Sequence, residues 1–228
     1  MPRTLFDLES LTDALKAKRP QVADHSLRVS QYSIGLATQY GLPQEALESV
    51  RLGALLHDVG KLLVPVTILM KTGRLSRRQE EELKIHPDLG VELAARAGMR
   101  DEVCRIILHH HERYDGLGYP DKKSGSEVHW TARIVAVMNA FDALVHPRGN
   151  RRPCSVDEAR TRIAQQAGSR FCPWIVGGLL SLPSTLLQLA PQRETPVYVP
   201  DGRPDPIATL ATQAWDFSSY NAGLEANC

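Results

Sequence analysis

The chain has 228 residues, of which 43% are hydrophobic and 23% are charged, which is enough apolar material to bury a sizeable core. The net charge of +1 gives no general case for binding DNA or a membrane surface. The four cysteines are scattered without a CxxC pair, and the first residues carry acids in place of an apolar run. We therefore expect a cytoplasmic protein with neither a redox dithiol nor a secretory signal.

Helical periodicity dominates over residues 22–190 and predicts an all-α fold. In the first segment, apolar residues follow helical spacing from Val22 until Gly41 and Pro43 end the pattern. A second helix is expected over residues 44–58, with its leucines and a valine on one face. No series of alternating apolar and polar residues indicates a β-sheet.

The middle of the chain carries local start and stop signals for further helices. Ser76 followed by Gln79 is a capping-box pattern, which predicts a helix start. The helix after Pro87 should stop near Gly98, a residue suited to the left-handed conformation at a helix end. Asp101 is expected to cap the next helix, which runs into three consecutive histidines.

Residues 113–129 lose helical periodicity and are rich in Asp, Gly, Pro, Lys and Ser, which predicts a long irregular loop. Periodicity resumes over residues 131–145. Ser155 with Glu158 is a second capping-box pattern, and the helix that it opens should end near Gly168.

The C-terminal part changes character at about residue 190. The apolar stretch 174–190 is broken by Pro183 and is too short to span a bilayer, so we expect two short core helices there. Residues 191–228 are Pro-rich and lose the helical period, which predicts an extended or partly disordered tail with a small hairpin around Asp201–Gly202. The predicted organisation is a helical domain over residues 1–190 followed by this tail.

A His-Asp pair closes the second predicted helix, in the string LGALLHDVGK. His57 offers a nitrogen ligand, and Asp58 offers two oxygens that can bridge two metal ions, as two-metal hydrolases require. Lys61 lies four residues after His57 and shares its face if the helical turn continues through Gly60. The pair alone is a weak signal, because a His-Asp dipeptide at a helix end is common by chance.

Further histidines are placed so that several separate segments can each supply a metal ligand. His25 lies near the start of the first helix, and His86 opens a helix before a proline. His110 and His111 lie at a helix end beside the irregular loop. Nitrogen and oxygen ligands without sulfur favour iron, manganese or zinc. Core packing alone explains such a spacing poorly.

The remaining three histidines are not expected to be ligands. A third consecutive imidazole at His109 would point away from the other two, which favours a packed or solvated position outside the site. His129 and His146 fit surface or loop positions better.

Taken in order, these motifs resemble those of the HD-GYP domain. The matching strings are HSLR at 25–28, LLHDVGK at 55–61, HP at 86–87, HHERYDGLGYP at 110–120 and RIVAVMNAFDAL at 133–144. The resemblance covers roughly residues 24–178 and is specific, because HD, HHE and DGxGYP occur in series. It implies an HD-type helical bundle with an irregular GYP loop, here followed by a short C-terminal tail.

The resemblance also implies an activity and a site. The activity would be hydrolysis of cyclic di-GMP to linear pGpG and/or GMP, by hydroxide that two divalent metal ions, iron or manganese, activate. Lys61 and Asp58 would be catalytic, with Lys61 facing the scissile phosphate. The implied metal ligands are His25, His57, Asp58, His86, His110, His111 and Asn139. The implied substrate-binding residues are Gly118, Tyr119 and Pro120 of the GYP loop, with Arg148 and Arg151, whose guanidinium groups match phosphate oxygens.

The chain departs from the family pattern at several positions. Asn139 stands where the family usually has a metal-binding Asp, and an amide oxygen attracts a cation less, so weaker retention of one metal is expected. Asp142 is an alternative ligand one turn away, although the family uses it outside the first coordination sphere. Gln21 replaces a Glu that supports a third ion in some members, which favours two metals. Residues 148–151 lack an aromatic residue that the family has near the substrate. Cys172 replaces an Asp, and this replacement should affect helix capping more than chemistry.

Three functions remain open on the sequence. The first is an active phosphodiesterase. The second is a degenerate module that binds cyclic di-GMP or a protein partner without efficient turnover, which Asn139 favours. The third is a phosphohydrolase of the wider HD class acting on another nucleotide, against which the GYP loop counts. The expected partners are cyclic di-GMP or a related cyclic dinucleotide and either a second copy of the chain or a separate regulatory protein, but not DNA or a membrane.

Overall fold

The computed structural model describes residues 7–146 and 152–188, and helices joined by loops make up all of the regular structure in these ranges. This confirms the predicted all-α fold. In chain order the elements are α1 (Leu8–Lys18), α2 (Pro20–Gln39), α3 (Gln44–Leu56), the 3-10 helix η1 (Val59–Leu62), α4 (Val66–Leu69), α5 (Arg77–Lys84), α6 (His86–Arg96), α7 (Asp101–His109), η2 (Gly125–Glu127), α8 (Trp130–Val145), α9 (Val156–Ala164), α10 (Pro173–Ser181) and η3 (Ser184–Leu187).

Local signals set most of the helix boundaries. Ser76 and Ser155 both form the predicted capping boxes, each with the residue three positions later. Gly98 follows α6 with a φ of 73°, which confirms the predicted left-handed end of that helix. The prediction for Asp101 was wrong by one residue. Arg100 holds the N-cap position in an extended conformation, and Asp101 lies inside the first turn, where its carboxylate faces the positive end of the helix.

The first helix, α1, was not predicted. The Asp7 side chain caps it by accepting a hydrogen bond of 2.8 Å from the Ser10 backbone N–H. Leu11 and Leu15 lie on one face and are fully buried. Pro20 occupies the first turn of α2, so that helix begins two residues before the predicted start, where a proline costs no backbone hydrogen bond.

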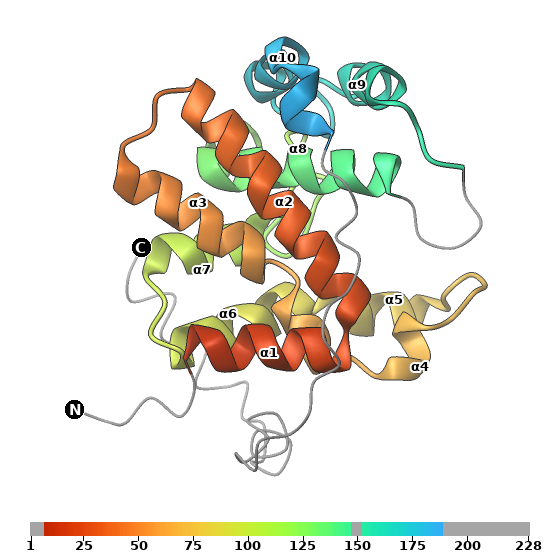
Figure 1. Ribbon diagram of the computed structural model, residues 1–228. Helices are drawn as coiled ribbons and strands as arrows, with labels where there is room; N and C mark the ends of the chain where they lie inside the picture. The colour runs from red at the N-terminus through yellow and green to blue at the C-terminus, as the bar shows by residue number, and fades with distance from the viewer. Residues whose placement is uncertain (1–6, 147–151, 189–228) are drawn as a thin grey trace.

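Two buried clusters form most of the core, and α2 and α3 contribute to both. One cluster joins α2 and α3 to α8, α9 and α10, with Tyr32 and Phe141 in edge-to-face contact at 5.3 Å between ring centroids. The other joins them to α1, η1, α6 and α7. In Figure 1, α1 lies at one edge of the bundle and α9 and α10 lie at the opposite edge, with α2 crossing between them. The middle of the bundle therefore receives residues from both clusters.

Glycine allows two of these elements to approach very closely. A Cβ on Gly60 of η1 would lie 1.9 Å from the His86 carbonyl oxygen and 2.6 Å from the Gly90 backbone nitrogen of α6. Real Cβ atoms essentially never come within 3.0 Å of such atoms, so only glycine fits between η1 and α6. This contact holds the segment after the His-Asp pair against the helix that begins with His86.

The C-terminal expectations are met in part. Pro183 separates α10 from η3, as expected for two short helices. The tail over residues 191–228, its hairpin around Asp201–Gly202 and the arginines Arg148 and Arg151 lie outside the described residues. Among the helices described, none is long and apolar enough to cross a membrane.

Candidate metal centre

The fold brings the predicted histidines together around one carboxylate. His25 comes from α2, His57 and Asp58 follow α3, His86 begins α6, and His110 and His111 follow α7. Apart from His111, which is partly exposed, each of these residues is at most 7% exposed. Two sets of ligand atoms lie close enough to hold a metal ion: one from Asp58, His86, His110 and His111, and one from His25, His57 and Asp58. Asp58 belongs to both sets, so its two oxygens are placed to serve two neighbouring ions.

Three of the histidines are fixed in the same way. The Nδ1 atom of His57 donates to the Ala54 carbonyl at 2.7 Å, three residues earlier. His86 donates to the Leu83 carbonyl at 2.8 Å, and His110 donates to the Ile107 carbonyl at 2.7 Å. A carbonyl oxygen only accepts, so the proton of each neutral ring lies on Nδ1, which leaves a lone pair on Nε2. This is the outer hydrogen bond that orients metal-binding histidines in proteins.

The free nitrogens converge on Asp58. Its Oδ1 lies 3.3 Å from the Nε2 of His86 and 3.9 Å from the Nε2 of His110, and its Oδ2 lies 3.4 Å from the Nε2 of His57. The Nε2 atoms of His86 and His110 are 3.4 Å apart. His57 Nε2 and Asp58 Oδ1 are buried without a hydrogen-bond partner, which is costly unless something else satisfies them. Buried lone pairs that face one another around a carboxylate fit a divalent cation.

The pKa shifts keep these groups in the protonation states that bind metals. Burial raises the pKa of Asp58, but the charge of Lys61, together with His57, outweighs it and holds the pKa well below its ordinary value. The Lys61 Nζ atom donates to Asp58 Oδ2 at 2.6 Å. Burial, and then the neighbouring imidazoles, lower the pKa values of His110 and His111 well below 6.5. The carboxylate is thus charged and these imidazoles are neutral near pH 7.

Asn139 and Asp142 take different positions on α8. The Asn139 Oδ1 atom lies 3.0 Å from His25 Nε2, at the edge of the second ligand set. Asp142 accepts from His25 Nδ1 at 2.6 Å and from Arg28 Nε at 2.6 Å, and it lies 3.0 Å from His146 Nδ1. These partners occupy its oxygens, which puts it behind His25 and argues against the alternative that it replaces Asn139 as a ligand. Burial opposes ionisation of Asp142, but the hydrogen bonds from His146, His25 and Arg28 hold its pKa below 3.8.

The GYP loop packs over the same site. A Cβ on Gly118 would lie 2.5 Å from the Arg113 backbone nitrogen and 2.7 Å from the His111 carbonyl oxygen, so only glycine allows the loop to fold back this closely. The Tyr119 ring stacks on the His111 ring at 4.7 Å with an interplanar angle of 22°. The bond from Tyr119 to Pro120 is cis. Gly118 and Tyr119 therefore border the ligand set through His111.

The predictions for the other three histidines have different outcomes. His109 lies in a packed position outside both ligand sets, as expected: it is buried, and its Nε2 lies 2.9 Å from Asp121 Oδ2. His129 and His146 stand at the two ends of α8, half-buried and hydrogen-bonded rather than free at the surface.

Two polar residues that support the site were not predicted. Arg28 follows His25 by one helical turn, and this spacing is the signal that could have placed it on the same face. Glu112 is buried and accepts a hydrogen bond of 2.8 Å from the Asp121 backbone N–H, which ties the end of α7 to the GYP loop.

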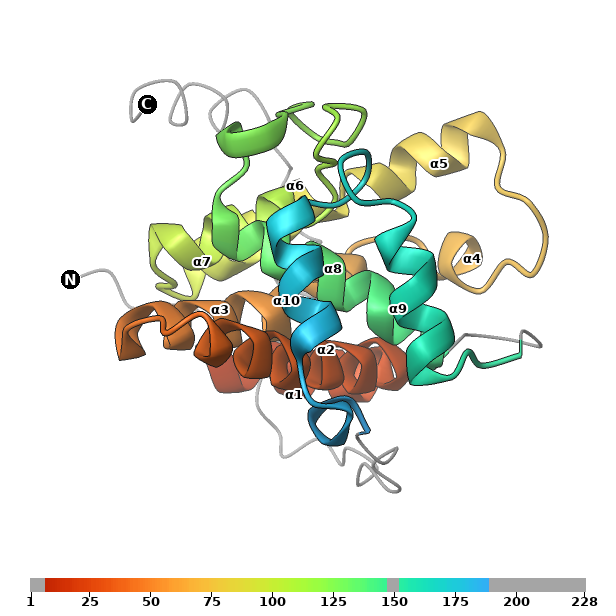
Figure 2. The same cartoon turned by 90° about the horizontal axis from the view of Figure 1, so that it is seen from above.

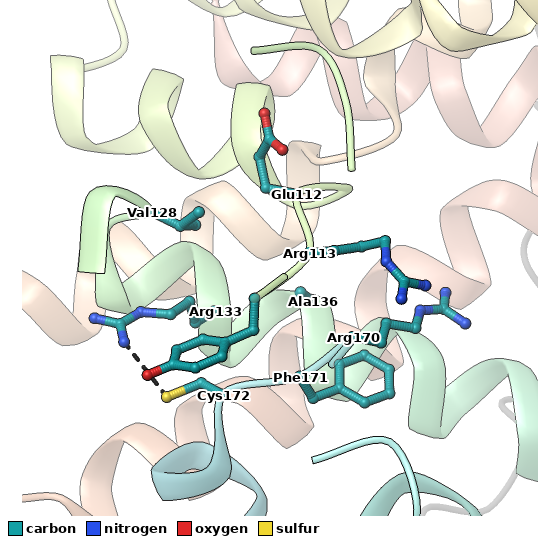
Figure 3. A pocket seen from close by; sticks show the side chains of 9 residues that line it. Glu112, Arg113, Val128, Arg133, Ala136, Arg170, Phe171 and Cys172 are labelled. Atoms are coloured by element: carbon teal, nitrogen blue, oxygen red, sulfur yellow. Dashed lines mark hydrogen bonds between the residues drawn. The ribbon is translucent and has the colours of Figure 1, made fainter. Parts of the chain in front are cut away.

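A small cavity lies beside the GYP loop and is drawn in Figure 3. The Arg133 guanidinium donates to the Cys172 sulfur at 3.4 Å on one side of it. Cys172 is the N-cap residue of α10 and makes no side-chain capping bond, as expected for the replacement of an Asp. Arg113 and Arg170 lie on the other side, with their guanidinium groups turned toward each other.

Comparison with known proteins gives matches over most of the chain. A family model described as an HD domain matches residues 9–175. The cyclic di-GMP phosphodiesterase response regulator RpfG of Xanthomonas campestris is 37% identical over 170 residues, which cover 74% of this chain and 45% of that protein. The 3'3'-cGAMP-specific phosphodiesterase 2 of Vibrio cholerae is 33% identical over 173 residues, which cover 75% of this chain and 33% of that protein. The chain thus spans between a third and a half of the length of these relatives.

A solved structure also shares the fold. A cyclic GMP-AMP specific phosphodiesterase of V. cholerae superposes with a TM-score of 0.62 at 20% identity, over 79% of this chain and 49% of that one. At this identity, the likeness supports the helical fold alone.

Proposed function

Because the chain belongs to the HD-GYP family, within the wider HD domain family, we propose that it is a metal-dependent phosphodiesterase whose substrate is cyclic di-GMP. The observation that carries the proposal is the position of Asp58 in two sets of ligand atoms, each suited to one ion and each from buried residues apart from His111. A single-ion or structural site would not need a carboxylate shared in this way. The relatives named above act on cyclic dinucleotides, which supports the choice of substrate class.

We assign the metal ligands as His57, His25 and Asn139 for one ion and His86, His110 and His111 for the other, with Asp58 between them. When bound, two divalent cations supply Lewis acidity for the phosphoryl oxygens and activate water for attack on phosphorus. Ligand sets without sulfur fit iron, manganese or zinc, and we propose iron or manganese because the resemblance to the HD-GYP domain implies these two. The Nδ1 hydrogen bonds of three of these histidines hold the rings in place without help from the ion.

Lys61 and the GYP loop are assigned to the substrate. The Lys61 ammonium group is held beside Asp58 at 2.6 Å and would stabilise the negative charge that develops on the phosphate oxygens during attack. Tyr119 places an aromatic ring against His111, next to the ligand set, where it would contact a nucleotide base. Gly118 and Pro120 hold that ring in position. Arg148 and Arg151 remain predictions as further phosphate ligands.

The proposed products are linear pGpG and/or GMP. Among the described residues, none is assigned to a guanine edge, so 3'3'-cGAMP belongs in any substrate panel beside cyclic di-GMP. The specific feature that favours a second candidate function is Asn139. With a neutral amide in place of a carboxylate, the chain would retain one ion poorly and serve as a module that binds the cyclic dinucleotide without efficient turnover.

The test is metal content and turnover measured on the same sample. We would purify the protein from medium with defined iron or manganese, determine metal per chain by elemental analysis, and follow cleavage of cyclic di-GMP and 3'3'-cGAMP by chromatography. We expect two ions per chain and turnover. We expect Asp58→Asn to lose most of its metal and at least about 100-fold in turnover, because both ligand sets lose their shared carboxylate.

Asp157→Asn is the matched control, because this α9 carboxylate is 90% exposed and lies outside both ligand sets. It should keep wild-type metal content and activity. A wild-type protein that binds cyclic di-GMP with fewer than two ions and cleaves neither substrate would favour the binding module over the enzyme. A protein that cleaves other nucleotides but neither cyclic dinucleotide would contradict the substrate assignment.

A further inference from the structure

The turn between α9 and α10 is fastened to the entrance of the GYP loop. The Tyr114 backbone N–H donates to the Arg170 carbonyl at 3.1 Å, and the Asp115 N–H donates to the Ser169 carbonyl at 2.8 Å. Figure 2 shows this turn and the loop after α7 on the same side of the molecule as α5. Gly168 begins the turn with a φ of 81°, and its N–H donates to the Phe171 carbonyl at 2.9 Å. These bonds fix the backbone of Arg170 next to the loop.

The Arg170 guanidinium is held without a carboxylate. It lies over the Phe171 ring at 5.1 Å from the centroid, and no hydrogen bond or ion pair of its side chain occurs within residues 7–146 and 152–188. Its neighbour Arg113 is already bound by Asp115 through two hydrogen bonds, of 2.9 Å and 2.5 Å. Partial desolvation and then the charge of Arg113 lower the pKa of Arg170. Of the two facing guanidinium groups, only that of Arg113 has a carboxylate partner among the described residues, so the pair carries a net positive charge.

The GYP loop links this charge to the candidate metal centre. A Cβ on Gly118 would lie 2.5 Å from the Arg113 backbone nitrogen, so the loop packs against the residue whose guanidinium faces Arg170. The next loop residue, Tyr119, stacks its ring on His111, a member of the ligand set around Asp58. The two guanidinium groups therefore lie beside the loop that borders this ligand set.

We propose that Arg170, with Arg113 beside it, binds the second phosphate of the cyclic dinucleotide, the phosphate that is not being cleaved. This inference rests on the proposed function. A cyclic dinucleotide carries two phosphodiesters on one ring, so when one lies at the metal ligands the other lies across the ring from it. A planar guanidinium without a carboxylate matches two phosphate oxygens at once. Arg170 is thus a specificity-determining residue for substrates with two phosphates.

The experiment compares substrates that have one phosphodiester and two. Metal-loaded wild type, Arg170→Ala, Arg170→Lys and the control Arg162→Ala would be assayed with cyclic di-GMP and with bis(p-nitrophenyl) phosphate. Arg162 is an exposed arginine on α9, near in sequence but absent from the lining of the cavity in Figure 3. Dissociation constants for cyclic di-GMP and for linear pGpG would be measured by calorimetry, and metal content would be measured for every variant.

For R170A we expect KM and Kd for cyclic di-GMP to rise about tenfold, as for loss of one charge-assisted hydrogen bond pair, with kcat little changed. Turnover of bis(p-nitrophenyl) phosphate and metal content should stay at the wild-type level. R170K should lose part of the affinity, because an ammonium group keeps the charge and loses the planar fork. R162A should match wild type throughout.

Several results would overturn the inference. One is an unchanged Kd for cyclic di-GMP in R170A. Another is an equal loss of activity with both substrates, or a loss of bound metal, because either would mean that the substitution acts on the fold or on the metal centre. A rise in Kd for pGpG alone would assign Arg170 to the terminal phosphate of the product. If wild type binds cyclic di-GMP and cleaves nothing, the proposed function fails, and the dissociation constants still decide the role of Arg170.

Discussion

Replacing Gly60 by alanine would test whether the contact between η1 and α6 holds the candidate metal centre together. The added methyl group would lie 1.9 Å from the His86 carbonyl oxygen and 2.6 Å from the Gly90 backbone nitrogen. Both atoms belong to the backbone of α6, so no side-chain rotation relieves the clash. The helix must move away by about an ångström, to reach the 3.0 Å that real Cβ atoms keep.

The cost follows from what that movement breaks. Overpacking of this kind typically costs 1–3 kcal/mol when side chains can give way, and we expect about 3 kcal/mol or more here because the backbone must move. That is a large part of the roughly 5–15 kcal/mol that stabilises a typical domain. Since α6 begins with His86, its nitrogen would move relative to Asp58 as well. A displacement of about 1 Å can cost about 100-fold in turnover.

The assay is urea unfolding followed by circular dichroism, with metal content measured on the folded protein. Gly35→Ala is the control, because Gly35 lies inside α2 and a Cβ there has nothing within 4 Å. The same change should stabilise that variant by about 0.5–1 kcal/mol, since alanine loses less backbone entropy in a helix. If G60A unfolds at the wild-type urea concentration and keeps its metal, the reasoning about this contact is wrong.

Three further predictions concern α8 and the GYP loop. Asp142→Asn should lower the free energy of unfolding by about 3 kcal/mol, because it leaves Arg28 without its buried partner. It should also weaken metal binding by about 10–100-fold, because Asp142 orients His25. An unchanged midpoint of urea unfolding would contradict the first effect. Because the folded pKa of Asp142 is lowered, its stabilisation is present above pH 3.8 and is lost as pH falls below that value, so the stability difference between wild type and D142N should shrink between pH 5 and pH 2. Asn139→Asp should increase the amount of metal that the protein retains during dialysis against a chelator. Two divalent ions together with Asp58, a hydroxide and a phosphodiester keep one positive charge, which the added carboxylate would neutralise. If the variant and wild type retain equal amounts of metal, the amide oxygen of Asn139 is already sufficient. Gly118→Ala should keep the metal but raise KM for cyclic di-GMP by about tenfold or more. The added methyl group would clash with the His111 carbonyl, so the loop must move away from it. A KM equal to that of wild type would rule out a role for the loop in substrate binding.

Sequence patterns predicted the helices where local chemistry sets them. The capping boxes at Ser76 and Ser155 and the left-handed Gly98 each depend on neighbours within a few residues, so they can be read without tertiary structure. Helix α1 was missed because two buried leucines make a weak periodic signal, although Asp7 supplied a cap. Its stability comes from packing against α2 and η1, which no local pattern records.

The sequence predicted which residues form the candidate site, but not the residues that hold them in place. The HD, HP and HHE motifs indicated ligands, and the structure brings those side chains together. The pairing of His25 with Asp142 joins residues 117 positions apart, and nothing in either helix alone predicts it. The place of Arg170 beside the GYP loop depends on backbone hydrogen bonds between two irregular segments, which carry no periodicity. Arg148 and Arg151 stay predictions.

The carbonyl groups that hold His57, His86 and His110 belong to the last turns of α3, α5 and α7. Carbonyls in that position have no partner within their own helix, so each imidazole caps the helix that precedes it. In small zinc-binding modules the chain folds only when the ion arrives, and binding energy is spent on folding. Here the hydrogen bonds that fix the same histidines run to backbone carbonyls and do not involve an ion. Chelation should therefore abolish turnover while leaving the far-ultraviolet circular dichroism unchanged, and metal should return without refolding.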